Sequence, residues 1–367
     1  MNASNSSFGA SGFLFRPTAP LENIRRRATL NRIIRAFFDE HGFIEVATPT
    51  LSRDAVVDRY VEPIPVEIEK CWQERDDFFN RRFRNSEPTQ KKSEVFYLQT
   101  SPEFAMKRLL AAGLESIYQI TPAYRRGDFG RFHNIEFTML EWYRSRMNYE
   151  EGRAFLAELI QTVSSRFYDS IDEEARPCFQ SAVEERSFSD VFIEKTGIHP
   201  CKTDSGELHK FAVAKGIAFP DSYCAQTQEE DWIDLIFSEM IQPELGQKAP
   251  VIVYDYPGGQ SQLAQTAAVD DAIVARRYEL FVNGIELANG YDELLDPNVL
   301  RKRIAQIAEQ RKQDGSPTLP VESRLLAAMD SGLPPSSGCA LGIERFLMTL
   351  LNAKTLAETI SFPTDVA

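Results

Sequence analysis

Two adjacent arginines stand in a short turn between two segments that alternate polar and apolar residues. Arg125 and Arg126 precede Gly127, and the chain then returns through a run of polar and aromatic residues. Arginine suits phosphate or carboxylate binding, because its planar guanidinium donates two hydrogen bonds to an anion and keeps its proton. A half-buried strand needs polar residues on one face only, yet here they occupy both odd and even positions. These polar residues are Asn134, Glu136, Thr138, Glu141 and Tyr143. We interpret the segment as part of a binding site.

Carboxylates and a further arginine recur near the C-terminal end of the chain. Glu286 and Glu293 lie between apolar neighbours on either side of Asn289-Gly290. Carboxylates in such surroundings are expensive to bury unless they meet cations. Arg345 stands at the start of an apolar helical pattern, where the helix dipole disfavours a positive charge. The sequence therefore favours functional roles for these charged residues over surface positions.

The elements that must position these residues are two hairpins and a glycine-rich strand. Residues 117–120 and 135–143 alternate as strands should, which predicts a long hairpin with Arg125 and Arg126 at its tip. Residues 278–282 and 285–288 predict a second, tight hairpin through Asn283-Gly284, with a further break at Asn289-Gly290. Residues 336–342 predict a glycine-rich strand that runs into the helix of Arg345.

Helical patterns and irregular segments account for the remainder. Helices are predicted over residues 21–41 with a stop at Gly42, after Ser101-Pro102, and from Pro297. We expect a flexible leader over residues 1–20, an insertion or mobile loop over 68–96, and a mainly helical excursion over 150–248. The rest of 21–367 forms one domain.

Composition and charge narrow the class of protein. The chain has 367 residues and a formal net charge of −13, and no basic domain or stripe typical of a nucleic-acid binder is visible. Its five cysteines are scattered, which favours free thiols in a reducing compartment. No signal peptide or stretch of about 20 apolar residues is present. We expect a cytoplasmic protein without membrane association, for which tRNA is an unlikely partner.

The central hairpin closely resembles motif 2 of class II aminoacyl-tRNA synthetases, and its residues 133–141 are similar to the lysine group. Residues 21–49 with Pro49 resemble motif 1, whose proline lies in a dimer interface, and Gly338, Gly342 and Arg345 match motif 3. The resemblance covers residues 21–367. It implies an α+β catalytic domain with a mostly antiparallel β-sheet flanked by helices, and a homodimer. Residues 1–20 are too few for the anticodon-binding β-barrel of full lysyl-tRNA synthetases, so none is expected.

Within the lysine group, the chain is most similar to the paralogues that join (R)-β-lysine to a lysine of elongation factor P. Ala340 stands where lysyl-tRNA synthetases usually have glycine, and these ligases carry alanine there. The resemblance implies ATP-dependent activation of (R)-β-lysine or lysine as an adenylate, with Mg²⁺, and elongation factor P as protein substrate. The alternatives are a truncated lysyl-tRNA synthetase and a non-catalytic paralogue that binds amino acid or nucleotide.

The resemblance also implies roles for individual residues. Those for ATP are Arg125, Arg126, Gly127, Asn134, Phe137, Glu286, Leu287, Gly342 and Arg345, with Arg125 and Arg345 as catalytic residues. Those for the amino acid are Ser101, Pro102, Glu103, Glu141, Tyr143, Glu293 and Ala340. Glu286 and Glu293 are implied as Mg²⁺ ligands.

Motif 2 departs from the family pattern at one position. The family usually reads Arg-x-Glu, whereas Gly127 stands here in place of the glutamate that helps to recognise adenine. Either Asp128 replaces that glutamate, or Arg126 and Asp128 form the working pair in a shifted register.

Overall fold

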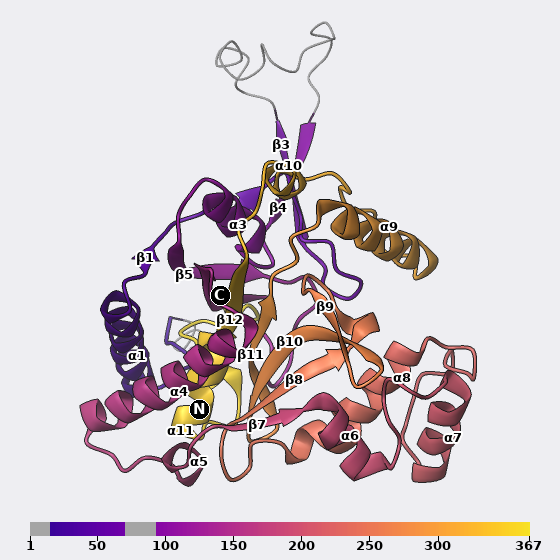
Figure 1. Cartoon of the computed structure of the whole chain (residues 1–367). Helices are drawn as coiled ribbons and strands as arrows, with labels where there is room; N and C mark the ends of the chain where they lie inside the picture. Colours follow the sequence, from indigo (N-terminus) through magenta and orange to yellow (C-terminus); the bar gives the residue numbers. More distant parts are fainter. Residues whose placement is uncertain (1–14, 70–92) are drawn as a thin grey trace, which may run out of the picture.

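A nine-stranded sheet forms the centre of the computed structural model, which describes residues 15–69 and 93–367 (Figure 1). Its strand order is β1-β5-β6-β12-β11-β10-β8-β7, and β9 pairs with β10. The bounds are β1 Ile44–Glu45, β5 Ser116–Tyr124, β6 Glu136–Ser145, β7 Glu184–Ser187, β8 Val251–Pro257, β9 Thr266–Val269, β10 Ala272–Val282, β11 Ile285–Asp292 and β12 Ser336–Gly342. β1 runs parallel to β5 and β7 parallel to β8, and the other pairs are antiparallel. The predicted α+β fold is confirmed.

The predicted central hairpin is confirmed as β5 and β6. Their pairing runs from Ser116 opposite Arg144 to Tyr124 opposite Glu136. Successive side chains of a strand point to opposite faces of the sheet. Tyr118 and Trp142 accordingly pack against one layer of helices and Ile117 against the other.

Two layers of helices cover these two faces (Figure 1). The first contains α1 Leu21–Glu40, α4 Tyr149–Ile171 and α11 Ile343–Leu351, which share one core with the central strands. The second contains α3 Glu103–Ala111, α9 Pro297–Gln313 and α10 Arg324–Asp330. The helix predicted after Ser101-Pro102 begins at Glu103. The Ser101 hydroxyl accepts a hydrogen bond of 3.0 Å from the backbone N–H of Glu103.

The second hairpin confirms one prediction and corrects another. Asn283 and Gly284 adopt φ values of 52° and 75° between β10 and β11, as a tight turn requires. The break predicted at Asn289-Gly290 is wrong, because β11 continues through both residues. A Cβ at Gly290 would lie 2.3 Å from a carbon of the Tyr278 ring, so this glycine permits close packing within the sheet.

A β-bulge in β11 determines where its glutamates point. Leu280 pairs with Ala288 and the next residue, Phe281, pairs with Glu286, which leaves Leu287 as an extra residue. Glu286 and Glu293 are separated by an odd number of positions, which in a regular strand would place their side chains on opposite faces of the sheet. The extra residue at the bulge shifts this alternation by one. The bulge therefore brings Glu286 and Glu293 to the same side of the sheet.

The excursion predicted over 150–248 is mainly helical, with one strand that the sequence reading missed. It contains α5 Pro177–Gln180, α6 Phe188–Thr196, α7 Ser205–Lys215, α8 Glu229–Ile236, the π-helical η2 Phe237–Ile241 and the 3₁₀ turn η3 Gln242–Glu244. The strand is β7, whose sequence Glu-Glu-Arg-Ser has no apolar alternation and whose position comes from pairing with β8. A capping box between Asn148 and Glu151 begins α4.

The predicted leader and insertion fall partly outside the described residues. Residues 1–14 and 70–92 lie outside them. Thr18 donates a backbone hydrogen bond to Ser361, and Ala19 is buried. β4 Ser93–Leu98 lies between β2 Leu51–Ser52 and β3 Ile64–Glu69 in a second sheet. The 3₁₀ turns η4 Gly258–Gln260 and η5 Leu356–Glu358 complete the elements.

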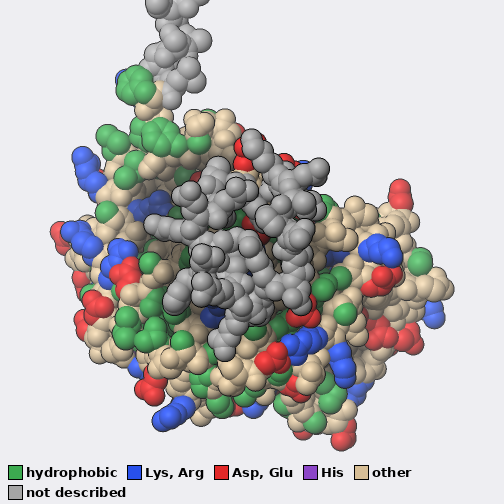
Figure 2. Space-filling view, turned by 90° about the horizontal axis from the view of Figure 1, so that it is seen from above, with side chains coloured by type: hydrophobic (Ala, Val, Ile, Leu, Met, Phe, Trp, Pro, Cys, Tyr) green, Lys and Arg blue, Asp and Glu red, His purple; other side chains and the backbone are tan. Residues whose placement is uncertain are grey.

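Acidic and basic side chains are interspersed over the surface seen in Figure 2. Around the edge of this face, Lys and Arg alternate with Asp and Glu, and neither sign forms a continuous patch there. Within residues 15–69 and 93–367, the helices are too short or too polar to cross a lipid bilayer.

Candidate active site

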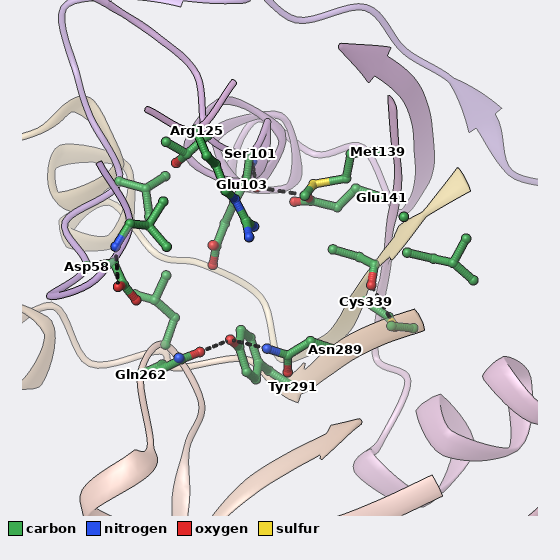
Figure 3. Close-up of a pocket in the computed structure, with 18 of the residues that line it drawn as sticks. Asp58, Ser101, Glu103, Arg125, Met139, Glu141, Gln262, Asn289, Tyr291 and Cys339 are labelled. Atoms are coloured by element: carbon green, nitrogen blue, oxygen red, sulfur yellow. Dashed lines mark hydrogen bonds between the residues drawn. The ribbon is translucent and has the colours of Figure 1, made fainter. Parts of the chain in front are cut away.

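A cavity of about 380 Å³ opens on the face of the main sheet that packs against α3 and α9 (Figure 3). Its floor consists of cross-strand pairs in which β12 contributes small residues. Ala340 lies between Glu141 of β6 and Asn289 of β11, and Gly338 lies between Tyr143 and Tyr291. Small residues on the central strand thus leave room between large polar side chains on its neighbours.

Most of the predicted site residues line this one cavity. They are Ser101, Glu103, Arg125, Asn134, Phe137, Glu141, Tyr143, Glu286, Leu287, Glu293, Ala340, Gly342 and Arg345. Three predicted residues, Pro102, Arg126 and Gly127, are not among its lining residues. Pro102 is buried at the start of α3.

The motif 2 turn separates its two arginines. Arg126 is exposed, and its backbone N–H donates to the Glu62 carbonyl at 2.7 Å, while Gly127 turns the chain at a φ of 85°. Arg125 and Asp128 both line the cavity. Of the two registers considered above, this placement favours Arg125 with Asp128 as the replacement for the glutamate.

Arginines converge on one end of the cavity. The Arg125 guanidinium lies 5.1 Å from the centre of the Phe137 ring, and its Nε is buried without a hydrogen-bond partner. Arg345 donates to the Glu286 carbonyl at 3.1 Å, and its Nη1 is 3.8 Å from the Glu286 carboxylate. Its Nη2 is 2.7 Å from Nε2 of His133. Desolvation and the Arg345 charge lower the pKa of His133, so the neutral ring accepts from the guanidinium.

The residues at this end of the cavity have the charge and the open space that binding of a nucleoside triphosphate requires. Two guanidinium groups face it, one of which has an unpaired buried N–H. A Cβ at Gly342 would meet nothing closer than 3.9 Å, so the space in front of this backbone is open. The Phe137 ring supplies an aromatic surface of the kind on which a nucleobase stacks.

The other end of the cavity is acidic and largely closed to water. Glu141 is 1% exposed, and it accepts hydrogen bonds from the Ser101 hydroxyl at 2.8 Å and the Tyr143 hydroxyl at 2.5 Å. Burial raises the pKa of Glu141 to about 7, and the nearby Glu103 carboxylate adds to the shift. Glu293 is also 1% exposed, and burial raises its pKa. Buried carboxylates without full compensation suit an ammonium ligand.

A chain of polar groups beside the floor was missed by the sequence reading. Asn289 donates to the Tyr291 hydroxyl at 3.1 Å, and that hydroxyl donates to Gln262, a residue at a φ of 43° (Figure 3). The Arg277 guanidinium joins this chain, because its Nε donates a hydrogen bond of 3.3 Å to the side-chain oxygen of Asn289. Residues 289, 291 and 293 alternate as one face of a strand, and this signal was obscured by interpreting Asn289-Gly290 as a turn.

The fold and site together define the catalytic domain of a class II synthetase: a mostly antiparallel sheet that presents one arginine from a hairpin and another from the helix after a glycine-rich strand. The family model for class II tRNA synthetases (D, K and N) matches residues 14–366, and the chain belongs to this family.

Curated relatives agree over almost the whole chain. The elongation factor P--(R)-beta-lysine ligase of Edwardsiella ictaluri is 35% identical over 355 residues, which cover 96% of this chain and 98% of that protein. Proteins with the same name from Yersinia pestis (strain Pestoides F) and Yersinia pseudotuberculosis (serotype O:1b) are 34% identical over the same shares.

Proposed function

We propose that this protein is an ATP-dependent ligase that activates (R)-β-lysine as an adenylate and transfers it to the ε-amine of a lysine on elongation factor P. The names of relatives that match 96% of the chain support this function. The observation that carries it is a single cavity with arginines at one end and buried carboxylates at the other. A substrate with a carboxylate and two amines needs both ends at once.

In the activation step, Arg125 would bind the α-phosphate and hold the substrate carboxylate near it. A carboxylate oxygen attacks the α-phosphorus, the bond to the β-phosphate oxygen breaks, and pyrophosphate leaves. Arg125 stabilises the negative charge that develops on the phosphate oxygens, and Arg345 holds the γ-phosphate. Arginine keeps its charge throughout, so no proton is lost from the anion site.

Mg²⁺ would be held by Glu286, and it would supply neutralisation of the phosphate charge. Glu293, which the resemblance also implies as a ligand, is paired with Lys107 at the acidic end of the cavity, and we propose it for the substrate amine instead. Glu286 fits this role, because its carboxylate is 38% exposed at the phosphate end of the cavity. Few protein carboxylates are needed, because phosphates and water complete the coordination of Mg²⁺.

In the transfer step, the ε-amine of the acceptor lysine attacks the acyl carbon and AMP leaves, which forms an amide and releases one proton. Glu103, Glu141 and Glu293 would hold the substrate ammonium groups during both steps. Ala340 lies on the floor beside Glu141, where its methyl group would select the position of the amine.

The test is incubation of the purified protein with ATP, Mg²⁺ and either (R)-β-lysine or α-lysine, in the presence of elongation factor P or tRNA. We expect pyrophosphate exchange that depends on (R)-β-lysine and a mass increase on one lysine of the factor. Efficient charging of tRNA with an unmodified factor would instead establish a lysyl-tRNA synthetase. Failure to exchange pyrophosphate with any lysine isomer would support a non-catalytic paralogue.

We also propose that the protein is a cytoplasmic homodimer. The support for a dimer is β1, which is the outer strand of the described sheet at this edge and leaves Ile44 54% exposed. A hydrophobic residue on an unpaired edge favours pairing with another chain. Light scattering of the purified protein should give twice the monomer mass, and a monomer at micromolar concentration would contradict the proposal.

A further inference from the structure

A buried lysine lies behind the acidic end of the cavity. Lys107 of α3 is 2% exposed, and its Nζ is 2.5 Å from Oε1 of Glu103 and 2.5 Å from Oε2 of Glu293. Glu103 lies one helical turn earlier on α3, whereas Glu293 follows β11. One ammonium group therefore joins two carboxylates from distant parts of the chain.

Lys107 itself does not reach the ligand space. Glu103, Glu141 and Glu293 line the cavity, and Lys107 is not among its lining residues. Figure 3 shows Glu103 and Glu141 at the cavity from α3 and β6. On the remaining side, the Lys107 ammonium lies 5.8 Å from the centre of the Tyr143 ring. The Lys107 ammonium thus has two carboxylates and an aromatic ring as neighbours, and the residue is almost fully buried.

We propose that Lys107 is a positioning residue that fixes Glu103 and Glu293 and limits the charge of the amine pocket to match a substrate with two ammonium groups. The inference rests on the function proposed above and extends it to a determinant of specificity. With the substrate ammonium groups bound, the three carboxylates would be ionised and contribute −3, and Lys107 contributes +1, which leaves −2. Two ammonium groups neutralise this charge, whereas a monoamino acid leaves one carboxylate uncompensated.

A buried charge without a partner is costly, which makes this balance selective. When an amino acid with only one ammonium group binds, one buried carboxylate must either stay ionised without a cationic partner or take up a proton. A permanent internal cation also keeps Glu103 and Glu293 aimed in one direction before the substrate arrives, because each is held at one oxygen. A simple role in helix stability would not require the second partner, Glu293, which lies outside the helix.

The proposal is tested with Lys107→Met, Lys107→Gln and Lys107→Arg in the full-length protein. Pyrophosphate exchange is measured at pH 7 and pH 8.5 with (R)-β-lysine and with its analogue that lacks the terminal amine. The KM for ATP and the melting temperature serve as internal measures of folding. Lys195→Met is the matched control, because Lys195 forms an ion pair with Glu244 at the surface, away from the cavity.

We expect Lys107→Met and Lys107→Gln to raise the KM for (R)-β-lysine by at least about tenfold at pH 7, with an unchanged KM for ATP. Without the cation the carboxylates hold protons more tightly, so pH 8.5 should restore part of the lost affinity in these variants. Selectivity for the diamino acid over the analogue should fall. Lys107→Arg, which keeps the charge, should retain more affinity than Lys107→Gln.

An unchanged KM and selectivity in Lys107→Gln would overturn the inference, as would equal defects in Lys107→Arg and Lys107→Gln that pH does not alter. If Lys107→Met does not fold, the comparison of Lys107→Gln with Lys107→Arg still decides. Failure of the wild-type protein to activate any diamino acid would refute the proposed function instead.

Discussion

The Tyr143 hydroxyl donates a hydrogen bond of 2.5 Å to the carboxylate of Glu141, two residues earlier on the same face of β6. Both side chains are almost fully buried, and the Ser101 hydroxyl donates to the other oxygen of Glu141. The carboxylate is therefore fixed in direction at the floor of the cavity but carries a charge that burial disfavours. An ammonium ligand would remove this cost, because it supplies the opposite charge that the buried carboxylate lacks.

Affinity for the amino acid should increase as pH rises through about 7. Burial raises the pKa of Glu141 to about 7, so below that pH the empty site is protonated and an ammonium must displace the proton. We expect the KM for (R)-β-lysine to fall between pH 6 and pH 8, with little change in the KM for ATP. In Glu141→Gln the KM should be high and should fall less over this range, because only Glu293, whose pKa burial raises to about 8, then titrates in the pocket. A fall as steep as in the wild type would show that Glu141 is not the group responsible.

The stability of the empty protein should change with pH in the opposite direction. A carboxyl whose folded pKa is raised from 4.5 to about 7 stabilises the fold below pH 4.5, and this contribution is lost as pH rises through 7. The loss is on the order of 3 kcal/mol. Glu141→Gln should flatten the decline in the free energy of unfolding between pH 5 and pH 8, as measured by urea titration. An equally steep decline in the variant would contradict this assignment.

The two motif 2 arginines should differ sharply in importance. Arg125 lines the cavity, whereas Arg126 is exposed outside it. Arg125→Ala should reduce pyrophosphate exchange by about a hundredfold or more, because a charged donor to the transition state is lost. Arg126→Ala removes a similar side chain one position away and should stay within about threefold of wild type. A larger loss of activity in Arg126→Ala than in Arg125→Ala would establish the shifted register, in which Arg126 and Asp128 form the working pair.

Much of this site was predictable from the sequence, because the hairpin and the glycine-rich strand have strong local patterns. Glu141, Tyr143 and Arg345 were found from these patterns and their resemblance to the family motifs, and the structure brings them to one cavity. The bulge at Leu287 was not predictable, because it depends on the pairing of β11 with β10. Lys107 was missed because its pattern within α3 is that of an ordinary helix position, and only the fold brings Glu293 to it.

Two glycines of β12 should respond differently to alanine. At Gly338 a Cβ would lie 2.3 Å from the Tyr143 ring and 2.4 Å from the Glu293 carboxylate, whereas at Gly342 it would meet nothing closer than 3.9 Å. Gly338→Ala should lower the melting temperature and abolish amino-acid activation. Gly342→Ala should fold normally and raise the KM for ATP, because the methyl group enters space that the nucleotide is proposed to use. Calorimetry and pyrophosphate-exchange kinetics distinguish the two variants. A normal KM for ATP in Gly342→Ala would show that the nucleotide does not bind in front of Gly342.

The methyl group of Ala340 should influence which lysine isomer is activated. Ala340 stands opposite Glu141 on one side and Asn289 on the other, so its side chain lies on the floor between polar groups. Ala340→Gly deepens this floor by one methyl group, and a change of that size is worth about tenfold in specificity. We expect kcat/KM for α-lysine to rise relative to (R)-β-lysine by about that factor, because an α-amine lies nearer the carboxylate and needs a different depth. Ala212→Gly, at a buried position in the separate core around α6, α7 and α8 that is not among the cavity-lining residues, is the control for a general loosening of the core. An equal change in selectivity in both variants would show that flexibility rather than the shape of the floor decides the choice of isomer.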